Sequence, residues 1–131
     1  MNPKIKELFL KNRGGQSIIE FAVLLPILLL VIFGITEFGR AILVKNVLHT
    51  AAREGARLAV VSDSTSAHGR VLEVLNAANV APKEIIIRFS IPERKVEVTI
   101  TTDFDVLSGG ILDPFMGTFE LKGKTVMRLE G

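Results

Sequence analysis

The sequence contains no cysteine among its 131 residues. This absence excludes disulfide bonds and thiolate chemistry, and it leaves the redox compartment undetermined. The chain has only two histidines, His49 and His68, which are far apart in sequence. Neither has a cysteine or a second histidine close by to complete a metal-binding set, so each is more simply explained as a surface or packed side chain.

Signals for catalysis and for nucleic-acid binding are also scarce. Gly109-Gly110 is not followed by the lysine and helix of a phosphate-binding loop. Asp103 and Asp105 flank one phenylalanine, but two carboxylates alone are a weak calcium signal. The net charge is only +2, which is little attraction for a nucleic acid. We therefore predict a non-enzymatic protein with no cofactor, no metal and no nucleic-acid partner.

The dominant feature that is present is an apolar run from Phe21 to Ile35, which contains no charged or strongly polar side chain. With its apolar flanks it reaches the roughly 20 residues that span a bilayer as a helix. Residues 1–15 carry four basic side chains against one acidic one. Basic residues stay on the cytoplasmic side, so the N-terminus is predicted inside and residues after about 40 outside. A cleaved secretory signal is the rival interpretation, but no good A-x-A site follows the apolar run.

Glu20 lies just inside this apolar run. A carboxylate in a membrane span is costly and is by default a functional candidate. A cut after Gly15 would leave the new α-amine of Gln16 one helical turn from Glu20, on the same face. The two charges could then pair within one chain or between neighbouring chains. The alternatives are an interfacial Glu20 that reaches headgroup water, and a Gly14-Gly15 pair that is only a hinge before an uncut anchor.

Pro26 lies well inside the predicted span and lacks the N–H that would bond the carbonyl of Ala22. A kink is expected there, and it would let the two halves of the helix face different partners. A mild kink without any role in assembly is the alternative, because proline is common in spanning helices.

The helical pattern continues beyond the membrane run, so one long helix is predicted over residues 16–62. Small residues recur at four-residue intervals in its second half, where they let another backbone approach closely. The partner is either another subunit or the protein's own sheet. These helix-packing positions are Ala51, Ala52, Gly55, Ala56 and Ala59.

A polar break over residues 62–66 precedes a second, amphipathic helix predicted over Ala67–Asn79, ended by Pro82. From Glu84 the apolar period becomes two, which predicts a hairpin of residues 84–91 and 96–104 with one apolar face containing Phe89 and Ile91. Residues 119–129 predict a last strand or a bulged pair. The apolar loop 107–116 either folds over the sheet, which we favour, or meets a partner.

Together these segments predict an α+β protein of pilin-like architecture: a long N-terminal membrane-spanning helix, a second amphipathic helix and a small antiparallel sheet. The expected divisions are a basic leader (1–15), a transmembrane and projecting helix (16–62) and an outward-facing α+β domain (63–131).

Residues 14–61 resemble the N-terminal region of the TadE-like family, pilin-like proteins of the tight-adherence (Tad, or Flp) pilus system. The matching motifs are EFA-x-x-L-P, EFGRA and AAREGAR, and the final TVMRLE is similar to the family's usual ending. A glycine followed five residues later by a glutamate is also the pattern of type IV prepilins.

The resemblance implies cleavage between Gly15 and Gln16 by a prepilin peptidase, and docking of Glu20 against neighbouring subunits. Implied partners are the major Flp-type pilin, other minor pilins, and the inner-membrane platform with its ATPase. The large outward domain favours a minor pilin or pseudopilin over the bulk subunit. An uncleaved single-pass inner-membrane assembly factor of a pilus or secretion system is the alternative. Both interpretations place the protein in the inner (cytoplasmic) membrane of a bacterium or archaeon, and the pilin interpretation adds the extracellular pilus.

Overall fold

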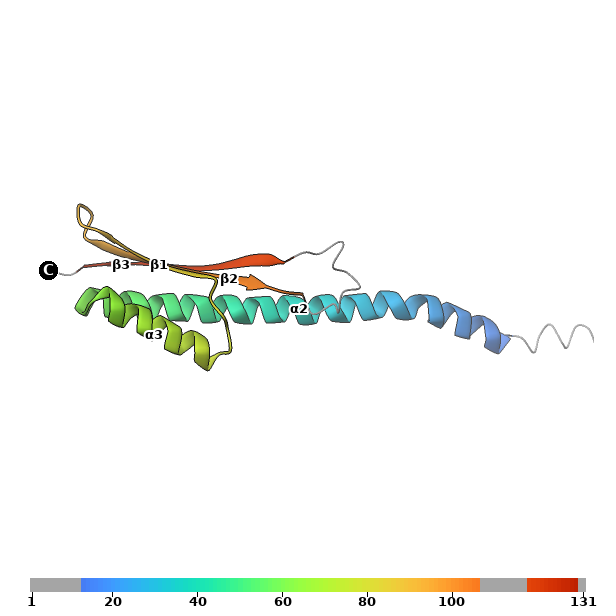
Figure 1. Ribbon diagram of the computed structural model, residues 1–131. Coiled ribbons are helices and arrows are strands. Elements are labelled where there is room, and N and C mark those ends of the chain that lie inside the picture. Colours follow the sequence, from blue (N-terminus) through green and yellow to red (C-terminus); the bar gives the residue numbers. More distant parts are fainter. Residues whose placement is uncertain (1–12, 107–117, 130–131) are drawn as a thin grey trace, which may run out of the picture. The chain divides into compact units, whose positions relative to one another are not determined.

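The computed structural model describes residues 13–106 and 118–129 of the chain. Two helices precede three strands (Figure 1): α2 (Arg13–Val61), α3 (Ser64–Ala77), β1 (Glu84–Ser90), β2 (Lys95–Phe104) and β3 (Phe119–Arg128). The chain divides into two compact units, residues 1–36 and 37–131, and α2 contributes to both. The predicted α+β fold, with a long apolar N-terminal helix, a second helix and a small antiparallel sheet, is confirmed.

In the first unit, every described residue is helical. The large apolar side chains from Ile18 to Ile35 are 39–71% exposed, so this unit covers none of them fully. The helix continues through Pro26, and it also includes Gly14 and Gly15. The helix thus includes residues before 16, where the sequence predicted its start, and the glycine pair does not interrupt it. Extending an existing helix backward by a glycine costs only about 1 kcal/mol, which the strongly helical segment that follows can offset.

The second helix begins earlier than predicted, at Ser64 instead of Ala67, because Asp63 caps it. The Asp63 carboxylate accepts hydrogen bonds from the Ser66 hydroxyl (2.5 Å) and the Ser66 backbone N–H (3.4 Å). The helix ends at Ala77, and Asn79 then adopts a left-handed backbone with φ 57°. The chain therefore leaves the helix before Pro82, where the sequence had suggested the stop.

The sheet has the order β1-β2-β3 with both pairings antiparallel. The predicted hairpin is confirmed as β1 and β2, and the last segment forms one strand. Val98 of β2 pairs with Ile87 of β1 and Thr125 of β3. The side chains therefore alternate between a face that carries Val96, Val98 and Ile100, all fully buried, and an opposite face that is mostly polar.

Both helices of the second unit pack on the apolar face of the sheet (Figure 1). Burying each large core side chain contributes roughly 1.5–3 kcal/mol. The largest fully buried side chains are Leu48 from α2, Val71 and Leu75 from α3, and Val96, Val98 and Ile100 from β2.

Two glycines allow this core to close. A Cβ on Gly123 of β3 would lie 2.6 Å from the Leu48 Cβ and 2.7 Å from the Leu48 carbonyl carbon. A Cβ on Gly55 of α2 would overlap the Val71 side chain of α3. Helix and strand, and helix and helix, therefore approach more closely at these points than any side chain permits.

The apolar face of the hairpin is less buried than its pattern predicted. Ile85 and Ile87 pack against the core, but Phe89 is 45% exposed and Ile91 is 85% exposed. Ile91 follows the last residue of β1 and lies in the turn. Both side chains are therefore available for contact with another molecule.

Candidate functional site

The first candidate site is the N-terminal end of α2. The Gln16 side-chain amide donates a hydrogen bond to the Glu20 carboxylate (Nε2–Oε1 3.2 Å). This contact shows that residues 16 and 20 share one helix face, as their spacing predicted. Glu20 is exposed, so its carboxylate has room for another donor. The side chain can therefore reach the residue that would carry a new α-amine after cleavage.

The apolar surface that follows is the largest exposed apolar feature of the described chain. By length and composition, α2 contains a segment able to cross a membrane, with a mean hydropathy of 2.9 in its most apolar window. The residues of that window are not covered by the rest of the chain. Soluble proteins seldom leave so much contiguous apolar area in water, so lipid or protein must cover it. Pro26 lies in this surface as well.

A second site, which was not predicted from the sequence, lies where the polar part of α2 begins. Arg40 donates a hydrogen bond to Glu37, three residues earlier (2.9 Å), and another to the backbone carbonyl of Asp105. Its guanidinium carbon lies 4.3 Å from the centroid of the Phe104 ring. Phe104 is 7% exposed, so this cation–π contact is partly desolvated. Arg40 thereby joins α2 to the end of β2, with an ion pair and a ring contact each contributing roughly 0.5–1 kcal/mol.

The signal for this Arg40 cluster was present in the sequence. Glu37 and Arg40 belong to the EFGRA motif, and they are the first charged residues after the apolar run. Their spacing predicts an ion pair on one helix face. The contact with Phe104 could not be foreseen, because the two residues are far apart in the sequence.

The five small residues of α2 lie inside the chain's own core. Ala51, Ala52 and Ala56 are fully buried, Ala59 is 3% exposed, and Gly55 is buried against Val71 of α3. Of the two alternatives, packing within the chain's own domain is therefore the one seen here. Their surfaces are used in holding α2 against α3 and the sheet.

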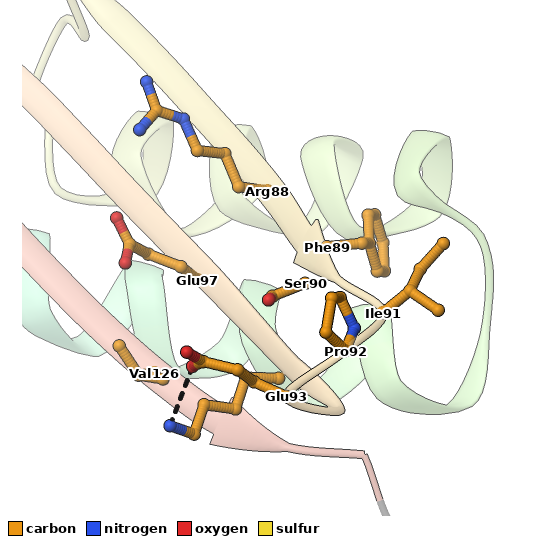
Figure 2. A pocket seen from close by; sticks show the side chains of 9 residues that line it. Arg88, Phe89, Ser90, Ile91, Pro92, Glu93, Glu97 and Val126 are labelled. Atoms are coloured by element: carbon orange, nitrogen blue, oxygen red, sulfur yellow. Dashed lines mark hydrogen bonds and ion pairs between the residues drawn. The ribbon is translucent and has the colours of Figure 1, made fainter.

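The polar face of the sheet carries an open groove of about 600 Å³ beside the turn between β1 and β2 (Figure 2). Arg88, Glu97 and Val126 lie across it on three successive strands, and the exposed Phe89 and Ile91 border it on the β1 side. The Glu97 carboxylate is paired with Lys124 (2.9 Å), and that pairing lowers the pKa of Glu97. The groove lining thus combines charges of both signs with apolar side chains, which suits a protein surface better than a small anion.

At the opposite end of the sheet, a lysine links neighbouring strands through ion pairs. Lys83 pairs with Glu120 (2.6 Å) and with Asp103 (3.0 Å), so one ammonium group joins all three strand segments. Its hydrogen bonds to these carboxylates raise the pKa of Lys83. The Asp103 carboxylate, a weak candidate for a calcium ligand from the sequence, is used in this network.

Residues 13–106 and 118–129 contain no group of three or more histidine, cysteine or acidic side chains that could hold a metal ion. His49 is half-buried on α2, and His68 is exposed on α3. The apolar loop 107–116, for which folding over the sheet and binding a partner were weighed, lies outside the described residues.

These features define a class: proteins with one apolar membrane-type helix whose polar continuation is built into a small α+β domain. Residues 15–57 match the model of the TadE-like protein family. The predicted resemblance to that family is thereby confirmed over this segment. No curated protein and no solved structure matches the chain.

The matched segment begins at Gly15 and ends at Arg57. It therefore contains Gln16 and Glu20, the apolar run, Glu37 and Arg40, and four of the five small residues. The second helix and the sheet lie outside the match, and the structure alone describes them.

Proposed function

We propose that this chain is a minor pilin or pseudopilin of a Tad-type pilus. It is anchored by residues 16–36 in the inner membrane, with residues 1–15 as a cytoplasmic leader and its α+β domain outside. A prepilin peptidase cuts between Gly15 and Gln16, and the mature chain enters the pilus through its N-terminal helix. The family match to residues 15–57 and the uncovered apolar surface of α2 support this role. It is a structural role and needs no catalytic residue.

The observation that carries the proposal is the contact between Gln16 and Glu20. Once Gln16 is the first residue, its α-amine and the Glu20 carboxylate lie about one turn apart on the same exposed face. Each charge is costly beside the bilayer unless it is paired. Pairing of one subunit's amine with the next subunit's Glu20 lowers that cost only at one stagger of the two helices. Glu20 would thus select the register of assembly.

The neighbours that supply this pairing are the major Flp-type pilin and other minor pilins. The inner-membrane platform and its ATPase move the chain out of the bilayer. Before this step, lipid covers the apolar surface of α2. Pro26 belongs to this docking surface: it frees the Ala22 carbonyl and allows α2 to bend against a neighbour.

An uncleaved single-pass assembly factor is the second candidate, and one observation favours it. Gly14 and Gly15 are helical, whereas a peptidase needs an extended backbone at the bond it cuts. The two glycines lie near the described start of α2, and glycine is a poor helix former. Unwinding the backbone at this point therefore costs less than opening the apolar part of the helix.

The deciding experiment is the intact mass and N-terminal sequence of the protein isolated from its native membranes. We expect a chain that starts at Gln16. The same protein from cells without prepilin peptidase is the control, and it should start at Met1. A chain that starts at Met1 in both cells would overturn processing and leave the fixed assembly factor.

A further inference from the structure

The sheet has two edges within the described residues, because β1 and β3 each pair only with β2. Each edge leaves a row of backbone N–H and C=O groups available to another strand. Both pairings in the sheet are antiparallel, so β1 and β3 run in the same direction. If a second copy lies beside the first in the same orientation, β1 of one copy therefore meets β3 of the other as a parallel pair.

Shared orientation is what membrane anchoring imposes. Copies inserted by the same helix with the same end inside have like strands that run in the same direction. Pairing β1 with β3 keeps this orientation, whereas pairing two β1 edges as antiparallel strands reverses one copy. We propose that copies of this chain join edge to edge, β1 of one to β3 of the next, and so extend one sheet through several subunits.

The register of this contact follows from the residues of β1 and β3 that lie at the same level, which means that they pair with the same residue of β2. Glu84 pairs through Thr101 with Lys122, and Ile86 pairs through Thr99 with Lys124. A second copy placed at the same level therefore brings its Lys122 beside Glu84. Among the described residues, Glu84 has no ion pair, and Lys122 has only a long one to Glu120 (3.9 Å). Opposite charges beside each other on adjacent strands stabilise a sheet.

Other registers bring like charges together. Sliding the second copy by two residues in one direction places its Lys124 beside Glu84 but also its Arg128 beside Arg88, so a like-charged pair offsets the opposite one. Sliding it in the other direction places its Glu120 beside Glu84 and its Lys124 beside Arg88. A slide of one residue exchanges the two faces of the strand. Like charges directly opposite are destabilising, so the level register is the one that the edge charges select.

The exposed apolar side chains fit the same register. Arg88 pairs through Glu97 with Val126, and Phe89 pairs through Val96 with Met127. The second copy therefore brings Val126, which is 48% exposed, against the stem of Arg88, and brings Met127 against Phe89. This contact closes the β1 side of the groove in Figure 2 and covers apolar area that the single chain leaves in water.

Such a contact uses different surfaces on the two copies, so it forms open chains instead of closed dimers. The inference rests on the proposed function only in that every copy is anchored in one membrane with one orientation. Cleavage after Gly15 and entry into a pilus are not required.

The absence of cysteine allows a direct test by disulfide cross-linking of the full chain in native membranes. The variant Ile86→Cys/Lys124→Cys carries one thiol at each edge, at the same level. Within one chain the two positions are two strands apart, about 10 Å, which is too far for a disulfide. Between adjacent strands of two copies the separation is about 5 Å. We expect a ladder of dimers, trimers and larger products after oxidation.

Matched variants serve as controls for this experiment. Each single substitution alone should give no ladder, and the two single variants expressed together should give dimers only. The variant Ile86→Cys/Arg128→Cys moves one thiol four residues along the edge and should cross-link weakly. Adding Glu84→Lys to the ladder-forming variant should lower the yield about three- to fivefold, and Lys122→Glu in the same chain should restore it.

Absence of a ladder from membranes that contain the inserted protein would overturn the inference. Dimers from Ile86→Cys alone, or adducts only with a different protein, would overturn it as well. The N-terminal sequence measured on the same sample separates the two proposals. A ladder from uncut chains leaves the edge contact standing without the pilin role, and cut chains without a ladder do the reverse.

Discussion

Gly123 shows how one residue sets the distance between a strand and a helix. Its missing side chain lets β3 lie against the backbone of Leu48, which is fully buried. Leu48 is the only leucine of α2 among the fully buried side chains, so this contact anchors the helix to the sheet. Any side chain at position 123 has to push β3 away from α2.

We predict that Gly123→Ala lowers the free energy of unfolding by roughly 1–3 kcal/mol, the usual cost of forcing a methyl group into a packed core. The added Cβ would lie 2.6–2.9 Å from Leu48 atoms, including backbone atoms that cannot move aside cheaply. Thermal unfolding of the full chain in detergent, followed by circular dichroism, measures the effect. Gly69→Ala is the control, because a Cβ there meets nothing within 4 Å and alanine favours the helix. Equal shifts in the two variants would contradict the close approach.

Glu20 carries the second prediction at the scale of residues. Glu20→Ala removes a carboxylate from the apolar span and should leave membrane insertion intact or improved. It should also abolish incorporation into sheared pili, because the partner of the new α-amine is lost. Immunoblots of the membrane and pilus fractions measure both. Ile19→Ala, which changes a neighbouring apolar residue, should assemble normally, and normal assembly of Glu20→Ala would refute the pairing.

At the scale of elements, α3 depends on its first turn. Asp63 is its cap, and hydrogen bonds chiefly from the Ser66 hydroxyl lower the pKa of Asp63 from 3.8 to about 2. A lowered pKa means that the folded protein favours the ionised carboxylate. Its contribution to stability is therefore complete above about pH 4 and is lost as the pH falls toward 2.

We predict that this contribution can be isolated by comparison with Asp63→Asn, which keeps a capping side chain but does not titrate. The melting temperature of the natural chain should exceed that of the variant by a constant amount above about pH 4.5. The difference should shrink as the pH falls from about 4 to 2. Melting curves across pH 2–6 measure it. A difference that does not change with pH would show that the cap is not charged when it acts.

Another element boundary is set by Arg40. Its contacts with Glu37, Phe104 and the Asp105 carbonyl hold the end of β2 to α2 just after the apolar run. A lysine could supply the charge but not the planar group that lies over the ring while donating in its own plane. The EFGRA motif therefore marks the point at which the polar part of α2 becomes attached to the sheet.

For the whole molecule, orientation in the membrane is the property on which both proposals depend. The chain without cysteine again permits a clean assay. We predict that His68→Cys, exposed on α3, reacts with a membrane-impermeant maleimide in cells whose outer layers admit the reagent. Asn2→Cys in the uncut chain should react only after the inner membrane is permeabilised. The opposite pattern would place the α+β domain in the cytoplasm and refute the pilin role.

The order of elements was predictable because each carries a strong periodic signal. The apolar run, the 3.6-residue pattern of the two helices and the alternation of β1 and β2 all arise from one face that must be buried. The boundaries that were wrong depend on local details. Because Asp63 caps α3, that helix begins at Ser64, three residues before the predicted start. Gly14 and Gly15 are helical because the strongly helical residues after them extend the helix back through both.

What the amino-acid sequence by itself determined is the membrane-type helix, the position of Glu20 on it and the TadE-like signature. These depend on composition and spacing along one continuous helix, so no distant contact can change them. Only the tertiary structure decided that the small residues of α2 face the chain's own core, that Arg40 meets Phe104, and which residues share a level across the sheet. Each of these pairs segments far apart in the sequence, and such a pairing is set by packing, which no local pattern encodes.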